Sequence, residues 1–198
     1  MVELADASDS KSDMGNHVWV QVPLPAPFLY IWKVIDMEFR DIYDQNKKLT
    51  GRTYKKGEML QEGDFALVVI TYIQNSRGEF LLQFTSKAKG NEWSSTGGHP
   101  KSGETSLQGI KTEVLEELGI DVDEREFEFV KTLALPFRFV DIYYLKKDID
   151  IQEIVIQEEE VEKVKWATSS GIEQLIQEGK FQKTHKLVYE EILKYLDK

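Results

Sequence analysis

The chain of 198 residues has no cysteine and only three histidines, and its basic residues are outnumbered by acidic ones, 25 to 35. The absence of cysteine excludes disulfide bonds and thiol nucleophiles, and it is compatible with a reducing, cytoplasmic setting. The excess of acidic residues gives a formal net charge of −10. This charge argues against a nucleic-acid polymer as partner, because binding such a polymer needs a basic surface.

Long apolar runs are also missing. The most apolar stretch, residues 18–35, is broken by Pro23, Pro25 and Pro27. A membrane span needs about 20 apolar residues without such breakers, and the acidic start at residues 1–16 is unlike a signal peptide. We therefore expect no membrane partner. Residues 1–36 form a polar and then Pro-rich extension that is either disordered, docked or a leader foreign to the domain, and residues 37–198 form one domain.

The remaining sequence alternates between strand and helix patterns. Apolar runs predict a short strand pair over 39–60, strands at 65–74, 79–84, 126–135, 137–145 and 161–167, and a strand or loop at 149–156. Ser169 or Ser170 is predicted to cap a helix over 172–178, and residues 183–196 form a last amphipathic helix, with Leu187 among its apolar residues. This interleaving predicts helices on both faces of a mixed sheet.

The most informative stretch is residues 97–120, in which a glycine pair precedes a helix rich in glutamate. Glu113, Glu116 and Glu117 share one face of this helix, and a second face carries Leu107, Ile110, Val114 and Leu118. No Lys or Arg lies three or four residues from any of the three glutamates. The cluster is either a solvated acidic face or a set of oxygen ligands for a hard cation, and the glycines favour the second interpretation because they let the backbone approach closely.

The stretch resembles the Nudix box, G-x5-E-x7-R-E-U-x-E-E-x-G-U, in which U is a bulky aliphatic residue. The matching positions are Gly98, Glu104, Glu113, Val114, Glu116, Glu117, Gly119 and Ile120. Thr112 stands where the family has arginine. In the family this arginine helps to orient the glutamates and pairs with the residue that matches Glu104. Here Glu104 is expected to turn to Lys101 or Lys111, or to be left loose.

The resemblance implies a fold, a reaction and a cofactor. The fold is α/β, a Nudix-type α/β/α sandwich with a mixed β-sheet, and the reaction is hydrolysis of a diphosphate bond in a nucleoside diphosphate linked to another moiety. The implied cofactor is Mg²⁺ or Mn²⁺. Glu113, Glu116 and Glu117 are its implied ligands and the catalytic residues, with a backbone carbonyl of Gly98 or Gly97 as a further ligand and Glu104 as a supporting catalytic carboxylate.

Weaker candidates for substrate binding lie outside these positions: Lys87, Lys89, Trp93, His99 and Glu160. The lysines form a basic loop that is either solvated or in contact with a substrate phosphate, and Trp93 is either packed or stacked on a base. Glu160 ends a run of three glutamates where the family often places a further acid, although such runs are commonly solvated. In isopentenyl-diphosphate isomerase, the residue that matches His99 is a metal ligand. A lone histidine is more often structural.

The run from about residue 39 to 166 resembles the Nudix branch that is similar to isopentenyl-diphosphate isomerase, through DIYDQNKKLTGR, NSRGEFLLQ and WSSTGGHP. That isomerase needs a protonating cysteine just before Gly-His-Pro, where this chain has Ser95, Thr96 and Gly97. We therefore favour a hydrolase of a small-molecule diphosphate. A non-catalytic nucleotide-binding module with a degenerate box is a third interpretation, for which Thr112 argues. A homodimer stays open, because Nudix proteins often dimerise and residues 18–35 offer an apolar surface.

Overall fold

The computed structural model describes residues 38–198. The extension expected over residues 1–36 lies outside the described residues. Within the described part, no helix is long and apolar enough to cross a membrane.

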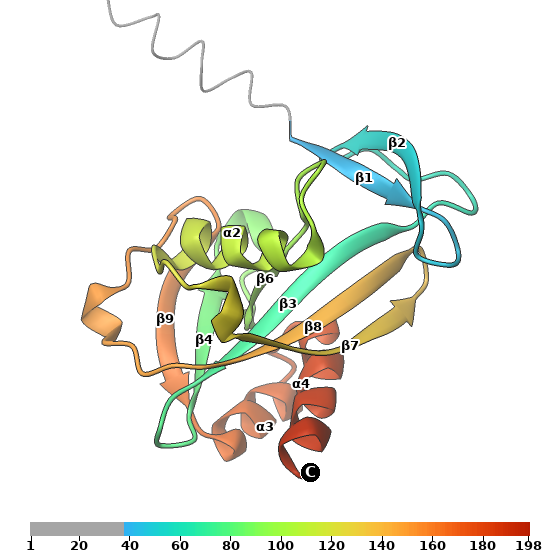
Figure 1. Ribbon diagram of the computed structural model, residues 1–198. Helices are drawn as coiled ribbons and strands as arrows, with labels where there is room; N and C mark the ends of the chain where they lie inside the picture. The colour runs from blue at the N-terminus through green and yellow to red at the C-terminus, as the bar shows by residue number, and fades with distance from the viewer. Residues whose placement is uncertain (1–37) are drawn as a thin grey trace, which may run out of the picture. The chain divides into compact units, whose positions relative to one another are not determined.

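The centre of the described unit is a mixed β-sheet (Figure 1). Its strands are β3 Ala66–Gln74, β4 Phe80–Thr85, β5 Trp93–Ser94, β6 Thr96–Gly98, β7 Phe127–Leu135, β8 Arg138–Lys146 and β9 Val161–Ala167. β3 and β8 are parallel, and β7 runs antiparallel to β8. β4 is in register with β3 only where Gln74 meets Phe80, and beyond that point β4 pairs with β5 and β9 while β3 pairs with β6. The sheet therefore parts between β3 and β4.

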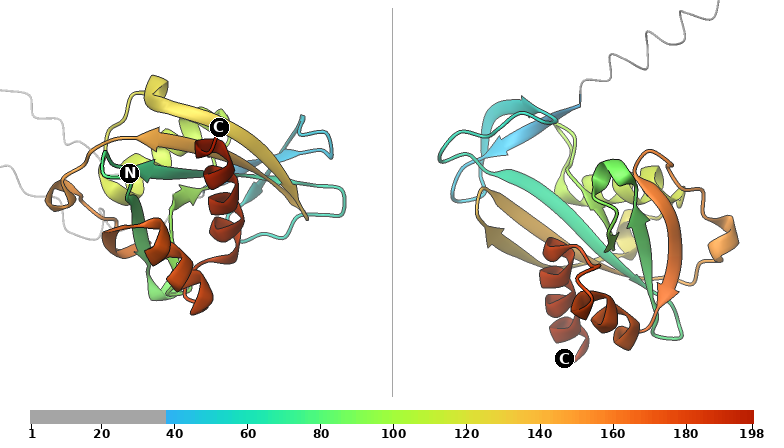
Figure 2. Two further views of the ribbon diagram at one scale, coloured as in Figure 1. Left: turned by 90° about the horizontal axis from the view of Figure 1, so that it is seen from below. Right: turned by 180° about the vertical axis from the view of Figure 1, so that it is seen from behind.

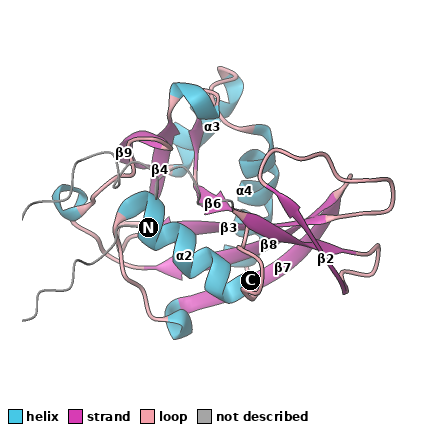
Figure 3. Cartoon of the chain, turned by 90° about the horizontal axis from the view of Figure 1, so that it is seen from above, coloured by secondary structure: helices cyan, strands magenta, loops and turns pink. Residues whose placement is uncertain are grey.

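Helices cover both faces of this sheet (Figures 1 and 2). α2 Ser106–Leu118 lies across β3 on one face, where Ile110, Val114 and Leu118 are fully buried (Figure 3). α3 Ser169–Gln177 and α4 Lys183–Leu196 cover the other face, with Ile172 and Val188 in the second core cluster. The two buried clusters on opposite faces confirm the expected α/β/α sandwich with a mixed sheet.

A two-stranded hairpin, β1 Phe39–Tyr43 and β2 Leu49–Lys55, stands beside the start of α2 and matches the strand pair expected there. Reciprocal backbone hydrogen bonds of 2.9 Å between Tyr43 and Phe65 join it to the chain entering β3. The hairpin is further fixed by Lys47 at its turn, whose ammonium group contacts the buried carboxylate of Asp141 on β8. The β1–β2 hairpin is therefore fixed to the sheet by both main-chain and side-chain contacts.

The helix ends follow local hydrogen bonds. α2 begins with a capping box, in which the Thr105 hydroxyl accepts from the Gln108 backbone N–H and the Gln108 side chain accepts from the Thr105 N–H. It ends at Gly119, whose φ of 68° is the left-handed conformation that favours glycine. α4 spans the predicted residues 183–196, although Leu187 is 42% exposed and lies outside the buried face.

One local prediction was wrong. α3 begins at Ser169 and is capped by Thr168, whose hydroxyl accepts from the Gly171 backbone N–H at 3.2 Å; Ser169 and Ser170, the predicted caps, are inside the helix. Three consecutive hydroxyl residues made the cap position ambiguous, because each can accept the same kind of hydrogen bond. Of the strand or loop expected at 149–156, the structure has the loop, with a short 3₁₀ turn at Ile151–Glu153.

Thr168→Ala should therefore destabilise the chain by about 1 kcal/mol, because it removes the acceptor for a backbone N–H at the start of α3. Ser170→Ala is the matched control and should cost less, since that hydroxyl contacts only the Thr168 hydroxyl in the described hydrogen bonds. Urea unfolding followed by circular dichroism measures both. An equal or larger loss in the Ser170 variant would contradict the assignment of the cap.

Candidate functional site

The site is built around a close approach between the glycine turn and α2. A Cβ atom on Gly97 would lie 2.4 Å from the Val69 carbonyl oxygen, so β6 can press against β3 only with glycine at this position. A Cβ atom on Gly98 would lie 2.2 Å from Oε1 of Glu113. The carboxylate of Glu113 thus occupies the space that any larger residue at Gly98 would fill.

Glu117 is the most buried of the three glutamates, with 4% of its surface exposed. Its Oε2 accepts a hydrogen bond from the Gln83 side-chain amide at 3.0 Å and another from the Gly97 backbone N–H at 3.3 Å. The Thr96 hydroxyl donates to the other end of the Gln83 amide at 3.3 Å. Gln83 is therefore a positioning residue that the sequence analysis missed, and the available signal was a lone polar residue on an otherwise apolar buried strand.

The electrostatic environment disfavours ionisation of two glutamates. Burial, followed by repulsion from Glu160, Glu116 and Glu38, raises the pKa of Glu113 to about 7. Burial and the neighbouring Glu113 raise the pKa of Glu117 to about 8, against the opposing effect of the Gln83 hydrogen bond. A buried acid pair of this kind is costly without a compensating cation, and pKa values this far from normal are typical of functional sites.

Glu116 differs from this pair in its exposure. It is exposed, and its Oε1 forms an ion pair of 2.5 Å with the Lys101 ammonium group. The separation arises because consecutive residues on a helix point about 100° apart, so Glu117 faces the sheet when Glu116 faces solvent. Among the described residues, no group of three His, Asp or Glu side chains converges as a ready-made metal site. The three glutamates thus lie along one side of α2, and their carboxylates do not converge on a single point.

Glu104 has one expected and one unexpected partner. The Thr112 hydroxyl, which was not expected to contact it, donates to Glu104 Oε1 at 2.8 Å, and the Lys101 backbone N–H donates to Oε2 at 2.7 Å. Of the two lysines expected to satisfy Glu104, Lys101 thus bonds it through the backbone, whereas Lys111 pairs with Asp121. Thr112, which stands in the arginine position, is thus bonded to the glutamate and ties α2 to the preceding loop.

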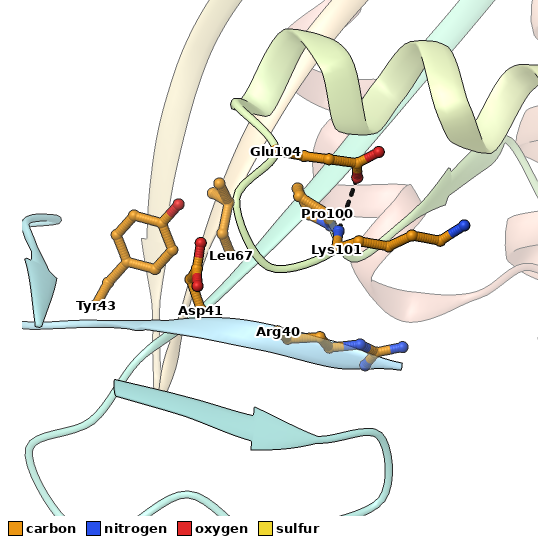
Figure 4. Close-up of a pocket in the computed structure, with 7 residues that line it drawn as sticks. All are labelled: Arg40, Asp41, Tyr43, Leu67, Pro100, Lys101 and Glu104. Atoms are coloured by element: carbon orange, nitrogen blue, oxygen red, sulfur yellow. Dashed lines mark hydrogen bonds between the residues drawn. The ribbon is translucent and has the colours of Figure 1, made fainter. Parts of the chain in front are cut away.

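The same loop is fastened to the hairpin, next to a small pocket (Figure 4). The pocket is lined by Arg40, Asp41, Tyr43, Leu67, Pro100, Lys101 and Glu104. Asp41 accepts hydrogen bonds from the Ser102 hydroxyl at 2.7 Å and the Gly103 backbone N–H at 2.9 Å. The loop that carries Glu104 is therefore held at both ends, by β1 and by α2.

The weaker candidates are distributed around this centre. Glu160 is half-buried and pairs with Lys89, whereas Glu158 and Glu159 are exposed. Lys87 is exposed and has no salt bridge within the described part of the chain. Trp93 packs 5.1 Å from the Phe84 ring, and the Lys165 ammonium group lies 4.0 Å above it. Its indole face is thus covered by a cation, which supports the packing interpretation.

His99 follows the glycine pair and is half-buried. Its pKa is lowered to about 3 by burial and then by the positive charge of Arg40, against the opposing effect of Glu38, with smaller lowering contributions from Lys89 and Arg138. The imidazole is therefore neutral at physiological pH.

The comparisons with known proteins agree with this arrangement. The NUDIX domain model matches residues 64–191, and an uncharacterized Nudix hydrolase of Listeria monocytogenes is 34% identical over 149 residues, which cover 73% of this chain and 88% of that protein. The chain belongs to the Nudix family, as the glycine turn and the glutamate helix indicated. An isopentenyl-diphosphate Delta-isomerase of Pectobacterium atrosepticum is 36% identical, but over 40% of this chain and 46% of that enzyme.

Solved structures support the fold. A crystal structure of DR0079 from Deinococcus radiodurans superposes with a TM-score of 0.66 at 19% identity and covers 77% of this chain and 98% of that one. A bifunctional NMN adenylyltransferase/ADP ribose pyrophosphatase from Francisella tularensis, complexed with AMP and a Mn ion, superposes with a TM-score of 0.56 at 17% identity over 66% of this chain and 42% of that one. At these identities the two structures establish the architecture alone.

The raised pKa of Glu117 predicts how stability depends on pH without divalent cations. Between the ordinary value of 4.5 and about 8, the folded chain holds this proton more tightly than the unfolded chain, so stability falls as pH rises through this window. Glu117→Gln removes the titration. In EDTA, the difference in unfolding free energy between variant and wild type should therefore shift in favour of the variant by on the order of 4 kcal/mol from pH 5 to pH 8.5. A difference that stays constant across this range would contradict the prediction.

The hydrogen bond between Thr112 and Glu104 also predicts a graded pair of variants. Thr112→Val keeps the shape of the side chain but loses the donor, and should cost about 1 kcal/mol in urea unfolding. Thr112→Ser keeps the donor and should stay closer to wild type. Wild-type stability of Thr112→Val, with a loss only in Thr112→Ser, would show that packing of the methyl group, and not the hydrogen bond, matters at this position.

Proposed function

We propose that residues 37–198 hydrolyse a diphosphate bond in a nucleoside diphosphate linked to another moiety, with Mg²⁺ or Mn²⁺ as cofactor. The observation that carries the proposal is the buried pair Glu113 and Glu117, held against the glycine turn with raised pKa values. Neither carboxylate has a basic side chain within hydrogen-bonding distance among the described contacts. Two acids in this state fit a hard cation, which favours their ionised forms.

The residues present fit such a cation by type. Glu113, Glu116 and Glu117 would hold it, with a backbone carbonyl of Gly98 as a further ligand. When bound, Mg²⁺ or Mn²⁺ neutralises charge on phosphoryl oxygens and makes a water more acidic. Metal affinity should rise with pH, since Glu113 and Glu117 must lose their protons to become ligands.

The chain's own residues then have separate tasks. Gln83 and the Gly97 backbone N–H orient the Glu117 carboxylate, and Glu104 fixes the loop that precedes α2 through Thr112. A glutamate that is not fully engaged as a ligand accepts the proton of the attacking water, which is general-base catalysis. To serve as a ligand, the exposed Glu116 would give up its ion pair with Lys101 at little cost, because exposed ion pairs contribute little to stability.

A family neighbour suggests substrates for the first assay. The Francisella tularensis protein is named as an ADP ribose pyrophosphatase and was crystallised with AMP and a Mn ion. We therefore include ADP-ribose in the panel, beside nucleoside diphosphate sugars, dinucleoside polyphosphates and isopentenyl diphosphate. The cytoplasmic location and the homodimer stay predictions.

Turnover of one panel member should require Mg²⁺ or Mn²⁺ and should disappear in EDTA. The double variant Glu116→Gln, Glu117→Gln should lower kcat/KM by more than about 100-fold, since loss of outer-shell partners of a metal already costs 10–100-fold in many enzymes. Glu124→Gln, at a half-buried residue of the 3₁₀ turn Glu124–Glu126 after α2, is the matched control and should leave activity unchanged. The measurement is product formation by chromatography. The absence of turnover on the whole panel, with metal-dependent nucleotide binding retained, would refute the hydrolase and favour a binding module.

A further inference from the structure

A chain of alternating charges runs along one side of the glutamate site. Lys89 Nζ lies 2.9 Å from Glu160 Oε1, and Lys56 Nζ lies 3.3 Å from the same oxygen. Lys56 also contacts Glu38 Oε2 at 3.1 Å, and Glu38 Oε1 accepts from Arg40 at 2.6 Å. Three cations thus share two carboxylates in these ion pairs.

The backbone holds both ends of this charge chain in place. The Ser86 backbone N–H donates to the Glu160 carbonyl at 2.8 Å, which ties the loop of Lys89 to the turn before β9. The Lys56 backbone N–H donates to the Glu38 carbonyl at 3.0 Å. The turn before β9 is in turn bonded to the end of α2, where the Gln157 N–H donates to the Glu117 carbonyl at 3.2 Å. The lysines are therefore displayed from fixed positions relative to α2.

The charges of this chain reach the site itself. Glu160 and Glu38 both raise the pKa of Glu113, and Lys89 and Arg40 both lower the pKa of His99. The lysines are also open to solvent, since the side chains of Lys56 and Lys89 are 47% and 40% exposed. As a stabilising cross-link such exposed pairs are worth little, so a structural role alone explains the arrangement poorly.

The decisive detail is that two ammonium groups face one carboxylate oxygen. A single carboxylate cannot neutralise two ammonium groups, whereas a phosphoryl group brings more negative charge and several acceptor oxygens. A phosphoryl oxygen in the place of Glu160 Oε1 would meet both Lys56 and Lys89. The Glu160 carboxylate therefore lies where an anionic ligand could bind both lysines.

We propose that Lys56 and Lys89 form a two-lysine binding site for the diphosphate group of the substrate, and that Glu160 is an internal stand-in which the diphosphate displaces. This deepens the proposed function, on which it rests for the identity of the substrate, and its ligand class is a diphosphate anion. Arg40 and Glu38 hold Lys56 from the other side. Lys56 thereby becomes a substrate-binding residue that comes from the hairpin and lies far in sequence from the glutamate helix.

The test is calorimetric binding of inorganic pyrophosphate to the full chain in EDTA. Lys56→Met and Lys89→Met should each weaken binding about tenfold or more, because each removes a charged hydrogen bond. Lys55→Met is the matched control, since Lys55 lies over the Phe39 ring outside the charge chain, and it should stay within about twofold. Wild-type affinity in both methionine variants would overturn the two-lysine site. Lys56→Arg should restore binding if charge and reach are what matter, which separates a binding role from a folding defect.

Glu160→Gln tests the stand-in role. It frees both lysines from their shared carboxylate, so pyrophosphate in EDTA should bind several-fold more tightly than to wild type. Unchanged or weaker binding would overturn the idea that Glu160 is displaced.

These measurements are distinguishable from a failure of the hydrolase proposal, because pyrophosphate binding in EDTA needs neither metal nor turnover. Lysine-dependent binding without any turnover would remove the hydrolase and keep the two-lysine site. If turnover is found, Lys56→Met should raise KM about tenfold with little change in kcat, as expected for lost uniform binding. Turnover with wild-type KM in both lysine variants would keep the hydrolase and remove the site.

Discussion

Two carboxylates pressed against a pair of glycines are the constraint on which the rest of the site depends. Glu113 fills the space beside Gly98, and Glu117 is bonded to the Gly97 backbone. Burial raises both pKa values, with repulsion from Glu160 acting on Glu113 and repulsion from Glu113 acting on Glu117, so the arrangement is unfavourable when both groups are charged. It persists because α2 is fixed from elsewhere, by its apolar face on the sheet and by a loop bonded at both ends.

Ion pairs surround these two buried carboxylates. Lys101 forms an ion pair with the exposed Glu116, and Lys56 and Lys89 both form ion pairs with Glu160. Glu116 and Glu160 are thus matched by lysines from the turn after β2, the loop after β4 and the loop before α2, although the chain as a whole is strongly acidic. A net charge of −10 is therefore compatible with an anionic substrate, because the local balance at the site differs from the global one.

Much of the fold could be predicted because its signals are local. The apolar period of residues 183–196 predicted α4 with correct ends, and the glutamate-rich helix expected after the glycine pair is α2. The cap of α3 was misplaced by one or two residues, since neighbouring hydroxyls offer the same hydrogen bond. The glutamates of α2 could be proposed as a site from their spacing, but the spacing did not show that Glu117 faces the sheet and Glu116 faces solvent.

By itself the sequence determined the α/β class, the strand and helix order, and the glycine turn followed by a helix with its glutamates, because propensity, periodicity and close-approach glycines act over a few residues. Tertiary structure alone decided which groups meet across the fold. Gln83 reaches Glu117 because the sheet parts between β3 and β4, and Lys56 reaches Glu160 because the hairpin stands beside the turn before β9. Such contacts join residues 34 and 104 positions apart. No local pattern encodes them, since their distance depends on the packing of every element between.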